Sequence, residues 1–515
     1  MRHMDSMRQK AAIEIPMSDI PEKTGGNHTP PDYERIFHPR RLAIIGVSAE
    51  GSGAGFGTGI FKSITTMGFA GEILPVNPKG GSIDGLTIFK SVADIPGDID
   101  FAVIAVAARY VPEALEACLK KGAAGAEIIS SGFSELDTEE GKTLEAQIKE
   151  IAARGIRVVG PNCFGIYCPA SGLTLLPGPD LSRESGPVAF LAQSGGMAID
   201  FAHAGKWMGI RFSKMVSFGN GADLRETDLL RYFKNDPETK VIAMYIEGIQ
   251  NGQTFFNEIR EAADKKPVIV YKGGLSRAGA RTVASHTASM GGSGVIWDSV
   301  LKQVHAIRVR DAEEMAQASL AFALLPPKEF RKISVIGGGG AIGVAACDLA
   351  EACGIEIPPL APELQARIDS CLPKPGSSAV NPVDVANPFV PPPYLKEILL
   401  AAAQDEQIDL QIIVSLLYHY KSVAKTFNKK VAEITPYKEL VQSVCDAANE
   451  TGKPIIAVLA NPKRGVEDLD IVEMIALARK EFTDRGIPVF DELHDAIRAI
   501  AHVNTYYGTK AHRKE

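Results

Sequence analysis

The sequence predicts an α/β protein made of three consecutive Rossmann-like or flavodoxin-like domains, each with a parallel sheet. Short β-branched runs recur about every 25–30 residues, amphipathic stretches lie between many of them, and glycine-rich turns follow several. This alternation is typical of βαβ units whose sheet is covered on both faces. The predicted strands cover residues 41–47, 72–76, 101–106, 127–130, 157–159, 187–193, 212–218, 241–247, 267–272, 333–336, 410–417, 454–459 and 487–490.

Length and composition fit this prediction. The chain has 515 residues, 45% of them hydrophobic and 23% charged, as in an ordinary soluble globular protein of about three domains. The formal net charge of −7 gives no general attraction to nucleic acid or to an anionic membrane. No apolar run reaches the ~20 residues that span a bilayer. The seven cysteines are scattered without a Cys-x-x-Cys pair, which indicates reduced thiols and a cytoplasmic setting.

Turn-rich segments suggest the domain boundaries. Residues 1–32 are polar and contain several prolines, so we expect a flexible extension there. The segment 169–186 is rich in Pro, Gly and Ser, and Pro326-Pro327 interrupts the pattern again. The predicted domains are therefore 33–166, 167–328 and 329–515.

The first glycine loop favours a phosphorylated ligand. Small residues after the first strand let the backbone approach a phosphate, and the next helix offers free N–H groups. A dinucleotide site also needs an acid at the end of the second strand, which instead ends Val76-Asn77-Pro78-Lys79. Lys79 suits a phosphate better than a ribose diol. A tight turn without any ligand is the alternative.

A single histidine, His286, lies among Ser, Thr, Gly and two arginines in the segment 273–292. No periodic apolar face surrounds it, so burial in a core is not its expected role. Neutral imidazole is a nucleophile near neutral pH, and the neighbouring hydroxyl and N–H groups would hold a phosphoryl group that it accepts. We expect a mobile glycine-rich loop here rather than a helix.

Glu247 ends the apolar strand 241–246, at the position where parallel sheets build their sites. Its carboxylate would accept an N–H from one ring nitrogen of His286 and fix the tautomer that attacks. A solvated glutamate at a strand end is the alternative.

Two further turns resemble each other, since each follows a strand and opens a helix without a bulky residue. Two helix N-termini aimed at one point would hold a phosphohistidine from both sides. The predicted phosphate-binding residues are Ser194, Gly195 and Gly196 in one turn and Gly339, Gly340 and Gly343 in the other. No Walker-type phosphate loop and no other ATP-binding module is recognisable, and we assign no metal site to this chain.

Several motifs in order resemble the NDP-forming acyl-CoA synthetases, the superfamily of ADP-forming acetyl-CoA synthetase and succinyl-CoA synthetase. The resemblance covers about residues 36–507, in the order of the ADP-forming acetate–CoA ligase α subunits. The motifs are Ser285-His286-Thr287-Ala288-Ser289, Gly160-Pro161-Asn162-Cys163, Gln193-Ser194-Gly195-Gly196 and Asn381-Pro382-Val383-Asp384-Val385.

The resemblance implies a CoA-binding domain, a phosphohistidine domain and a CoA-ligase domain. It makes His286 the phosphorylated residue and Glu247 its partner, with the two glycine turns holding the phosphate. The CoA contacts that it implies are Ser48, Val76 and Lys79, to which we add Gly46, Gly55, Gly57 and Asn77 of the same loops. Asn162 and Cys163 would lie near the thioester chemistry, and Asn381 and Asp384 match an Asn-x-x-Asp motif of the third domain.

The implied reaction is ATP + carboxylate + CoA ⇌ ADP + phosphate + acyl-CoA, through an acyl phosphate and a phosphohistidine relay. Because the family's ATP-grasp module is absent, ATP and Mg²⁺ are expected on a partner β subunit, in an α2β2 hetero-oligomer. Three alternatives remain at this point: a non-catalytic CoA-binding protein, an NAD(P) oxidoreductase, and a transferase that uses acyl or carbamoyl phosphate.

Overall fold

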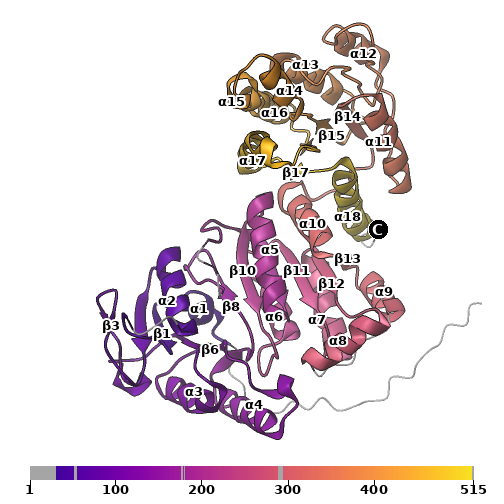
Figure 1. The fold of residues 1–515 in the computed structure, drawn as a ribbon. Helices are drawn as coiled ribbons and strands as arrows, with labels where there is room; N and C mark the ends of the chain where they lie inside the picture. Colours follow the sequence, from indigo (N-terminus) through magenta and orange to yellow (C-terminus); the bar gives the residue numbers. More distant parts are fainter. Residues whose placement is uncertain (1–30, 52–54, 176–177, 179, 288–293, 513–515) are drawn as a thin grey trace, which may run out of the picture.

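The computed structural model describes residues 31–51, 55–175, 178, 180–287 and 294–512, without the side chains of 284–287 and 511–512. It contains three mainly parallel sheets that follow one another along the chain, as predicted. Figure 1 shows the first two sheets side by side in the lower half of the molecule and the third in the upper half.

The first sheet has the strand order β2-β1-β5-β6-β7, and all its pairings are parallel. Its strands are buried on both faces, which explains their continuous apolar sequences. The elements are α1 (Tyr33–Phe37), β1 (Arg41–Ile45), α2 (Phe56–Met67), β2 (Glu72–Val76), the hairpin β3 (Ser82–Ile83) and β4 (Leu86–Thr87), η1 (Val92–Asp94), β5 (Phe101–Ile104), η2 (Ala108–Tyr110), α3 (Val111–Lys120), β6 (Gly125–Ile128), η3 (Ser134–Leu136), α4 (Glu139–Ala152) and β7 (Arg157–Val159).

The second sheet has the order β13-β12-β11-β9-β10-β8. Only β8 is antiparallel; it spans the predicted boundary at residue 166 and joins this sheet by pairing with β10. The elements are β8 (Gly165–Tyr167), β9 (Ser185–Ala192), α5 (Gly195–Met208), β10 (Phe212–Ser217), α6 (Glu226–Phe233), β11 (Val241–Ile246), α7 (Gly252–Lys265), β12 (Val268–Lys272), α8 (Arg277–Thr287), α9 (Gly294–Gln303), β13 (Ile307–Val309) and α10 (Ala312–Leu324).

The third sheet has the order β14-β15-β16-β17 and is entirely parallel. The elements are β14 (Ile333–Gly337), α11 (Gly340–Ala352), α12 (Pro362–Asp369), α13 (Pro392–Ala403), β15 (Leu410–Val414), α14 (His419–Thr426), α15 (Val431–Ile434), α16 (Tyr437–Thr451), β16 (Ile455–Val458), η4 (Val466–Asp468), α17 (Leu469–Asp484), β17 (Val489–Phe490) and α18 (Leu493–His512).

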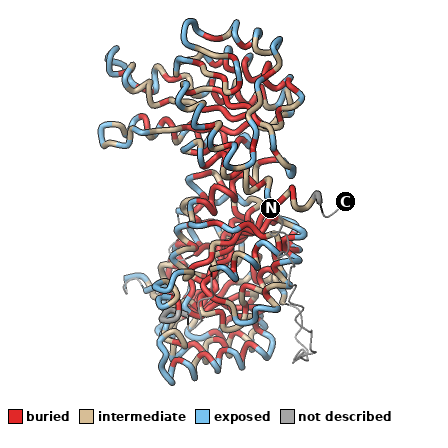
Figure 2. Tube along the Cα trace, turned by 90° about the vertical axis from the view of Figure 1, so that its right-hand side faces the viewer, coloured by how far each residue is buried: buried red, intermediate tan, exposed pale blue. Residues whose placement is uncertain are grey.

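One hydrophobic core joins the second and third sheets. It contains Phe190 and Met315 from the second unit together with Val335 and Ile500 from the third. Helix α10 is buried on nearly every side because it lies between the second sheet and α18. In Figure 2 the buried segments run from the lower half of the molecule into the upper half.

The segment that contains His286 is helical, which contradicts the predicted loop. Helix α8 covers residues 277–287, and the Ser276 hydroxyl accepts a hydrogen bond from Gly279 N at 3.0 Å, as an N-cap does. Alanine at positions 278, 280 and 284 supports the helix. The glycines and polar residues of the segment suggested a loop, whereas this cap and these alanines favour a helix.

Candidate functional site

The carboxyl ends of four neighbouring strands meet at one edge of the second sheet. Gln193 follows β9, Asn220 lies beyond β10, Glu247 follows β11 and Gly273 follows β12. Ligand sites of open α/β sheets are built at this edge. The predicted Glu247 and the predicted turn at Ser194 are therefore both at the same end of the sheet.

Glu247 is buried, at 9% exposure, and its surroundings hold it in place. The Tyr245 hydroxyl donates to Glu247 Oε1 at 3.0 Å. The backbone N–H groups of Glu247 and Gly248 both donate to Gln193 Oε1, the latter at 2.9 Å. Gln193 thus joins the turn after β9 to the turn after β11, and the solvated strand end considered above does not apply.

Lys272 lies beneath this turn with 3% exposure. Its Nζ donates to the carbonyl oxygens of Glu247, at 2.7 Å, and of Gly273. Burial lowers the pKa of Lys272 to about 8, although the Glu247 carboxylate favours the charged form. The ammonium therefore holds together the ends of the two strands that lead to Glu247 and to the His286 helix.

His286 belongs to α8, but its side chain lies outside the described residues. Helix α8 lies against η3 of the first domain, next to the boundary between the first and second sheets. Its backbone is thus near the same edge as Glu247, and the pairing of the two side chains stays a prediction.

The turn before α5 has an open helix N-terminus. The Ser194 hydroxyl accepts from Met197 N at 3.3 Å, and Gly195 packs against the Phe164 ring. A Cβ at Gly195 would lie 2.6 Å from ring carbons, so glycine is required there. The same contact brings the Gly-Pro-Asn-Cys loop, which Phe164 follows, to the start of α5.

The turn before α11 differs from the turn before α5. The position that a Cβ would take on Gly340 lies 3.4 Å from Asp384 Oδ2, so a carboxylate already lies at this helix N-terminus. Between the described residues of the two turns there is no hydrogen bond or ion pair, and Figure 1 shows α5 and α11 in different halves of the molecule. The convergence of Gly339, Gly340 and Gly343 with the α5 turn stays a prediction.

Asn381 and Asp384 organise the third domain. Asn381 is buried, and its amide donates to the carbonyls of Ile333 and Pro358, both at 2.9 Å, and accepts from Val335 N at 3.0 Å. Asp384 Oδ1 accepts from Ala386 N at 2.8 Å. Because the Asn381 donors are both used, the geometry gives this residue a structural role.

The Gly-Pro-Asn-Cys loop exposes one residue and buries the other. Asn162 is exposed, with a left-handed backbone (φ 55°). Cys163 is 2% exposed and donates to the Ile128 carbonyl at 3.3 Å, and burial raises the pKa of its thiol. Burial also raises the pKa of the neighbouring Glu127 to about 8, against the hydrogen bond from Ile166 N. Cys163 is therefore a buried neutral thiol, and Asn162 is the polar group of this loop that faces solvent.

The predicted CoA residues lie together at the carboxyl edge of the first sheet. The chain from Ser48 to Glu50 lies beside residues 80–82, where Glu50 N donates to Ser82 O at 3.2 Å. The Asn77 side chain accepts from Lys79 N at 3.0 Å, and Lys79 is exposed. Val76 O accepts from Gly46 N at 2.9 Å, and a Cβ on Gly57 would meet Gly46 O at 2.5 Å. Gly55 is the N-cap of α2.

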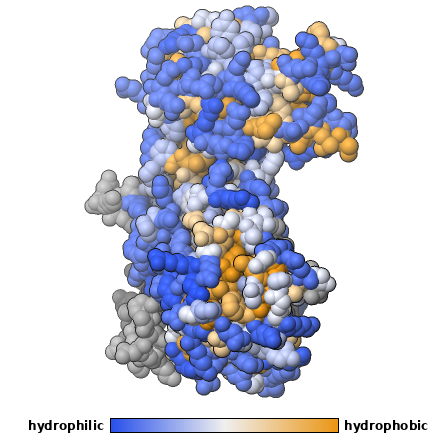
Figure 3. All heavy atoms as spheres, turned by 90° about the vertical axis from the view of Figure 1, so that its left-hand side faces the viewer, coloured by the Kyte–Doolittle hydropathy of each residue, from blue (hydrophilic) through white to orange (hydrophobic). Residues whose placement is uncertain are grey.

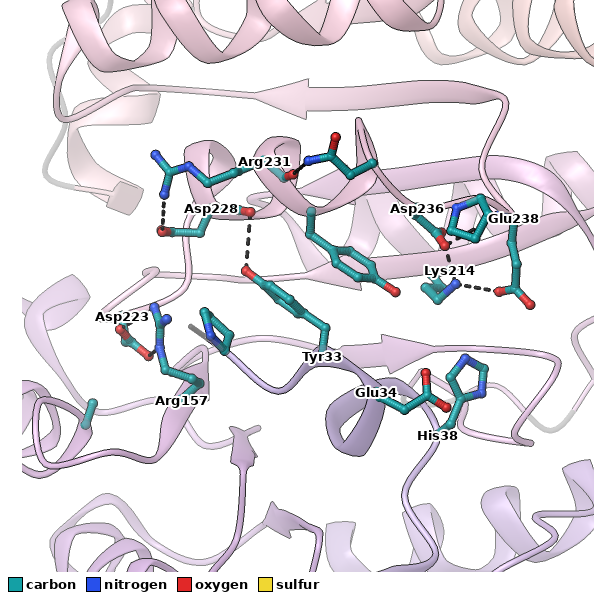
Figure 4. A pocket seen from close by; sticks show the side chains of 15 residues that line it. Tyr33, Glu34, His38, Arg157, Lys214, Asp223, Asp228, Arg231, Asp236 and Glu238 are labelled. Atoms are coloured by element: carbon teal, nitrogen blue, oxygen red, sulfur yellow. Dashed lines mark hydrogen bonds and ion pairs between the residues drawn. The ribbon is translucent and has the colours of Figure 1, made fainter. Parts of the chain in front are cut away.

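A cavity of about 1010 Å³ lies elsewhere, between α1, β10 and α6 (Figure 4). Its charged groups pair with one another: Arg157 with Asp223 at 2.8 Å, and Lys214 with Asp236 at 3.0 Å. Tyr33 donates to a backbone carbonyl at 3.3 Å. None of the predicted site residues lines it, and we interpret it as a polar seam between the first two sheets.

Sequence reasoning did not assign Gln193, Tyr245, Lys272 or Asn220 to the site, nor Glu135, whose Oε2 accepts a hydrogen bond from Asn220 Nδ2 at 2.6 Å. Gln193 lies in the Gln193-Ser194-Gly195-Gly196 motif, which served to predict a phosphate-binding turn and the family resemblance but gave Gln193 itself no role. Asn220 and Lys272 lie beyond or at the carboxyl ends of predicted strands, so the rule that identified Glu247 would have found them. Tyr245 and Glu135 have no such signal.

No helix in the described part of the chain is long and apolar enough to cross a bilayer. Two family models match the sequence: one described as a CoA binding domain over residues 40–169, and one described as a succinyl-CoA ligase like flavodoxin domain over residues 185–322.

The acetate–CoA ligase [ADP-forming] I subunit alpha of Pyrococcus furiosus is 34% identical over 94% of this chain and 99% of its own length. The 4-hydroxybutyrate–CoA ligase [ADP-forming] of Nitrosopumilus maritimus is 30% identical over 90% of this chain and 63% of its own length. The structure of Ca. Korarchaeum cryptofilum dinucleotide forming acetyl-coenzyme A synthetase 1, in complex with phosphate and ADP, matches with a TM-score of 0.78 and 30% identity over 93% of this chain and 98% of that one. With the folds and motifs above, these matches establish that the chain belongs to the ADP-forming acyl-CoA ligase family, as a relative of its α subunits.

Proposed function

We propose that this chain forms acyl-CoA with His286 as a phosphate carrier and Glu247 as the partner of its imidazole. The main support is the convergence, at one sheet edge, of the Glu247 turn, the α5 turn and the Gly-Pro-Asn-Cys loop. Glu247 would accept an N–H from one ring nitrogen, so that the other attacks phosphorus. Tyr245 and Gln193 fix the side chain and the backbone of Glu247, which preorganises it for this role.

The chemistry divides into two transfers. The carboxylate oxygen attacks the phosphoryl group on His286: the O–P bond of the acyl phosphate forms, the N–P bond breaks, and His286 leaves as neutral imidazole. CoA–SH then attacks the carbonyl carbon of the acyl phosphate. The C–S bond forms, the C–O bond to phosphate breaks, and the thiol proton leaves with the phosphate. The α5 turn, with Ser194, Gly195 and Gly196, is the better phosphate site, because Asp384 places negative charge at the α11 turn. Asn162 is the exposed donor of the thioester loop, while Cys163 packs beneath it.

The first domain would bind CoA. Lys79 is exposed and would contact a phosphate, and the second strand ends with Asn77 in place of the acid that holds the adenosine ribose of NAD. Phe56 begins α2 directly after Gly55 and is 75% exposed, which suits stacking on an adenine ring or packing on pantetheine. Figure 3 shows an apolar patch on the face of the lower half seen from the side of this domain.

The domain roles follow the same proposal. We assign residues 33–166 to CoA binding, 167–328 to the phosphohistidine chemistry and 329–515 to a CoA-ligase domain, supported in the first two by the positions of the family models. The extension 1–32 lies mostly outside the described residues. The seven thiols, which are all free, support a cytoplasmic location.

ATP and Mg²⁺ would bind to an ATP-grasp β subunit, in an α2β2 assembly. The Pyrococcus relative is named a subunit, whereas the Nitrosopumilus relative is a longer chain that this one covers for 63%. In this proposal the nucleotide module is supplied by a separate chain. The carboxylate is open, since the named acids of the relatives differ: acetate in one and 4-hydroxybutyrate in the other.

A phosphorylation experiment tests the proposal. The chain is incubated with acetyl-CoA and inorganic ³²P-phosphate, or with ATP and its partner, and the label is mapped by mass spectrometry. We expect an acid-labile, base-stable phosphoramidate on His286, lost in His286→Ala. Glu247→Gln should slow labelling by about 10²–10⁴-fold. A label on another residue, or full turnover in His286→Ala, contradicts the relay.

A further inference from the structure

A polar network joins Asn220 of the second domain to the thioester loop and to two carboxylates of the first domain. The Asn220 Nδ2 donates to Glu135 Oε2 at 2.6 Å and to Glu145 Oε2 at 3.1 Å. Its Oδ1 accepts from Asn162 Nδ2 at 3.3 Å, and its backbone N donates to Pro161 O at 3.0 Å. Three chain segments that are far apart in sequence therefore meet at one side chain.

The two carboxylates determine which way the Asn220 amide points. Glu145 is 6% exposed; burial opposes its ionisation, but hydrogen bonds from Lys149, Ser134 and Asn220 outweigh this and lower its pKa. Glu135 Oε1 accepts from the N–H groups of Gly132, at 2.6 Å, and Phe133, at 3.1 Å. Ionised carboxylates only accept hydrogen bonds, so Asn220 must turn both of its N–H donors toward them.

That orientation leaves only the Asn220 oxygen for Asn162. The Asn162 amide must then present its Nδ2 to Asn220, which fixes where its second N–H and its Oδ1 point. Within the described residues this is the only side-chain hydrogen bond that Asn162 makes, and its side chain is exposed. Helix α8, which contains His286, lies against η3, where Glu135 sits.

We propose that Glu135 and Asn220 are positioning residues that aim the Asn162 amide at the reacting acyl group. This inference rests on the proposed function. When CoA attacks the acyl phosphate, negative charge develops on the carbonyl oxygen, and a fixed amide N–H stabilises it without having to reorient. Asn162 is then the group that touches the substrate, and the other two residues act through it.

The test measures thiol release by the full-length chain from acyl-CoA and inorganic phosphate, which yields acyl phosphate and CoA–SH. Acetyl-, isobutyryl-, succinyl- and benzoyl-CoA are compared, and the fastest is used. We expect Asn162→Ala to lower kcat by about 10²-fold and Asn220→Ala by about 10-fold, with KM for the acyl-CoA changed less than about twofold. Asn235→Ala, an exposed asparagine with its own side-chain hydrogen bonds, is the control.

A double-mutant cycle distinguishes positioning from general support of the fold. If Asn220 acts through Asn162, Asn162→Ala/Asn220→Ala is no slower than Asn162→Ala alone. Losses that multiply overturn the inference. Should Asn220→Ala misfold, Glu135→Gln replaces it, because glutamine keeps an acceptor for the backbone but turns a donor toward Asn220. An unchanged kcat in Glu135→Gln also overturns the inference. A wild type that releases thiol from none of the four acyl-CoAs contradicts the proposed function, and the inference with it.

Discussion

The Lys272 ammonium donates to the backbone carbonyl of Glu247 at 2.7 Å, across the carboxyl ends of β11 and β12. A side chain that leaves the sheet beside the His286 helix thus supports the main chain of the residue proposed to orient that histidine. This contact requires a buried charge, and the burial of that charge lowers the pKa of Lys272.

The Lys272→Met variant should reveal the effect of this burial through pH. The folded pKa, about 8, lies below the unfolded value near 10.5, so the unfolded chain binds more protons between these pH values. Wild-type stability relative to Lys272→Met should therefore rise as pH increases from about 8 to 10. Melting temperatures of both proteins at pH 7.5 and 9.5 measure the difference. A gap that stays constant between the two pH values would show that Lys272 titrates normally.

Glu127→Gln should stabilise the protein at neutral pH and above. The folded pKa, about 8, lies above the ordinary 4.5, so the unfolded carboxyl ionises first and stability is lost as pH rises between these values. Glutamine does not ionise and still accepts from Ile166 N. The variant should gain up to about 4 kcal/mol over wild type between pH 5 and 8, measured by urea unfolding. A stability difference between the variant and the wild type that is the same at pH 5 and at pH 8 would contradict the raised pKa of Glu127.

CoA should bind to this chain and NAD should not. Calorimetric titration of the wild type with each ligand tests the inference that NAD does not bind because Asn77 stands where a dinucleotide site needs an acid. Lys79→Ala should weaken CoA binding by about tenfold, since an exposed charge-assisted contact to phosphate is lost. Lys90→Ala, an exposed lysine of the same domain, is the control. Tight NAD binding without CoA binding would contradict the assignment of the first domain to CoA binding.

The chain alone should not make acyl-CoA from ATP, because no nucleotide module is recognisable in its sequence. Addition of an ATP-grasp subunit should give turnover. The assay measures ADP release together with the consumption of the CoA thiol. A rate on the order of 1 per second or more from the purified single chain would show that the partner is unnecessary.

The sequence predicted the three sheets because their strands are buried and alternate with helices at regular spacing. It predicted Glu247 and Ser194 because both directly follow apolar strands. The loop predicted at His286 was wrong, since the cap at Ser276 and the alanines of this segment favour a helix despite its glycines. Gln193, Asn220 and Glu135 act through contacts between distant segments, and nothing local in the sequence shows that Asn220 faces two carboxylates. Asn381 matched a motif, yet only its hydrogen bonds reveal that it ties β14 to its neighbours.

The hydrophobic core shared by the second and third sheets also limits how far the last domain can move relative to the second unit. Glu314 and His502, 3.0 Å apart, and Tyr506, which donates to Ala263 O at 2.8 Å, fasten α18 to the second unit, so the last domain is not a swinging arm. A partner that supplies the nucleotide would therefore dock against the second and third sheets as one surface, because α18 packs against both of them.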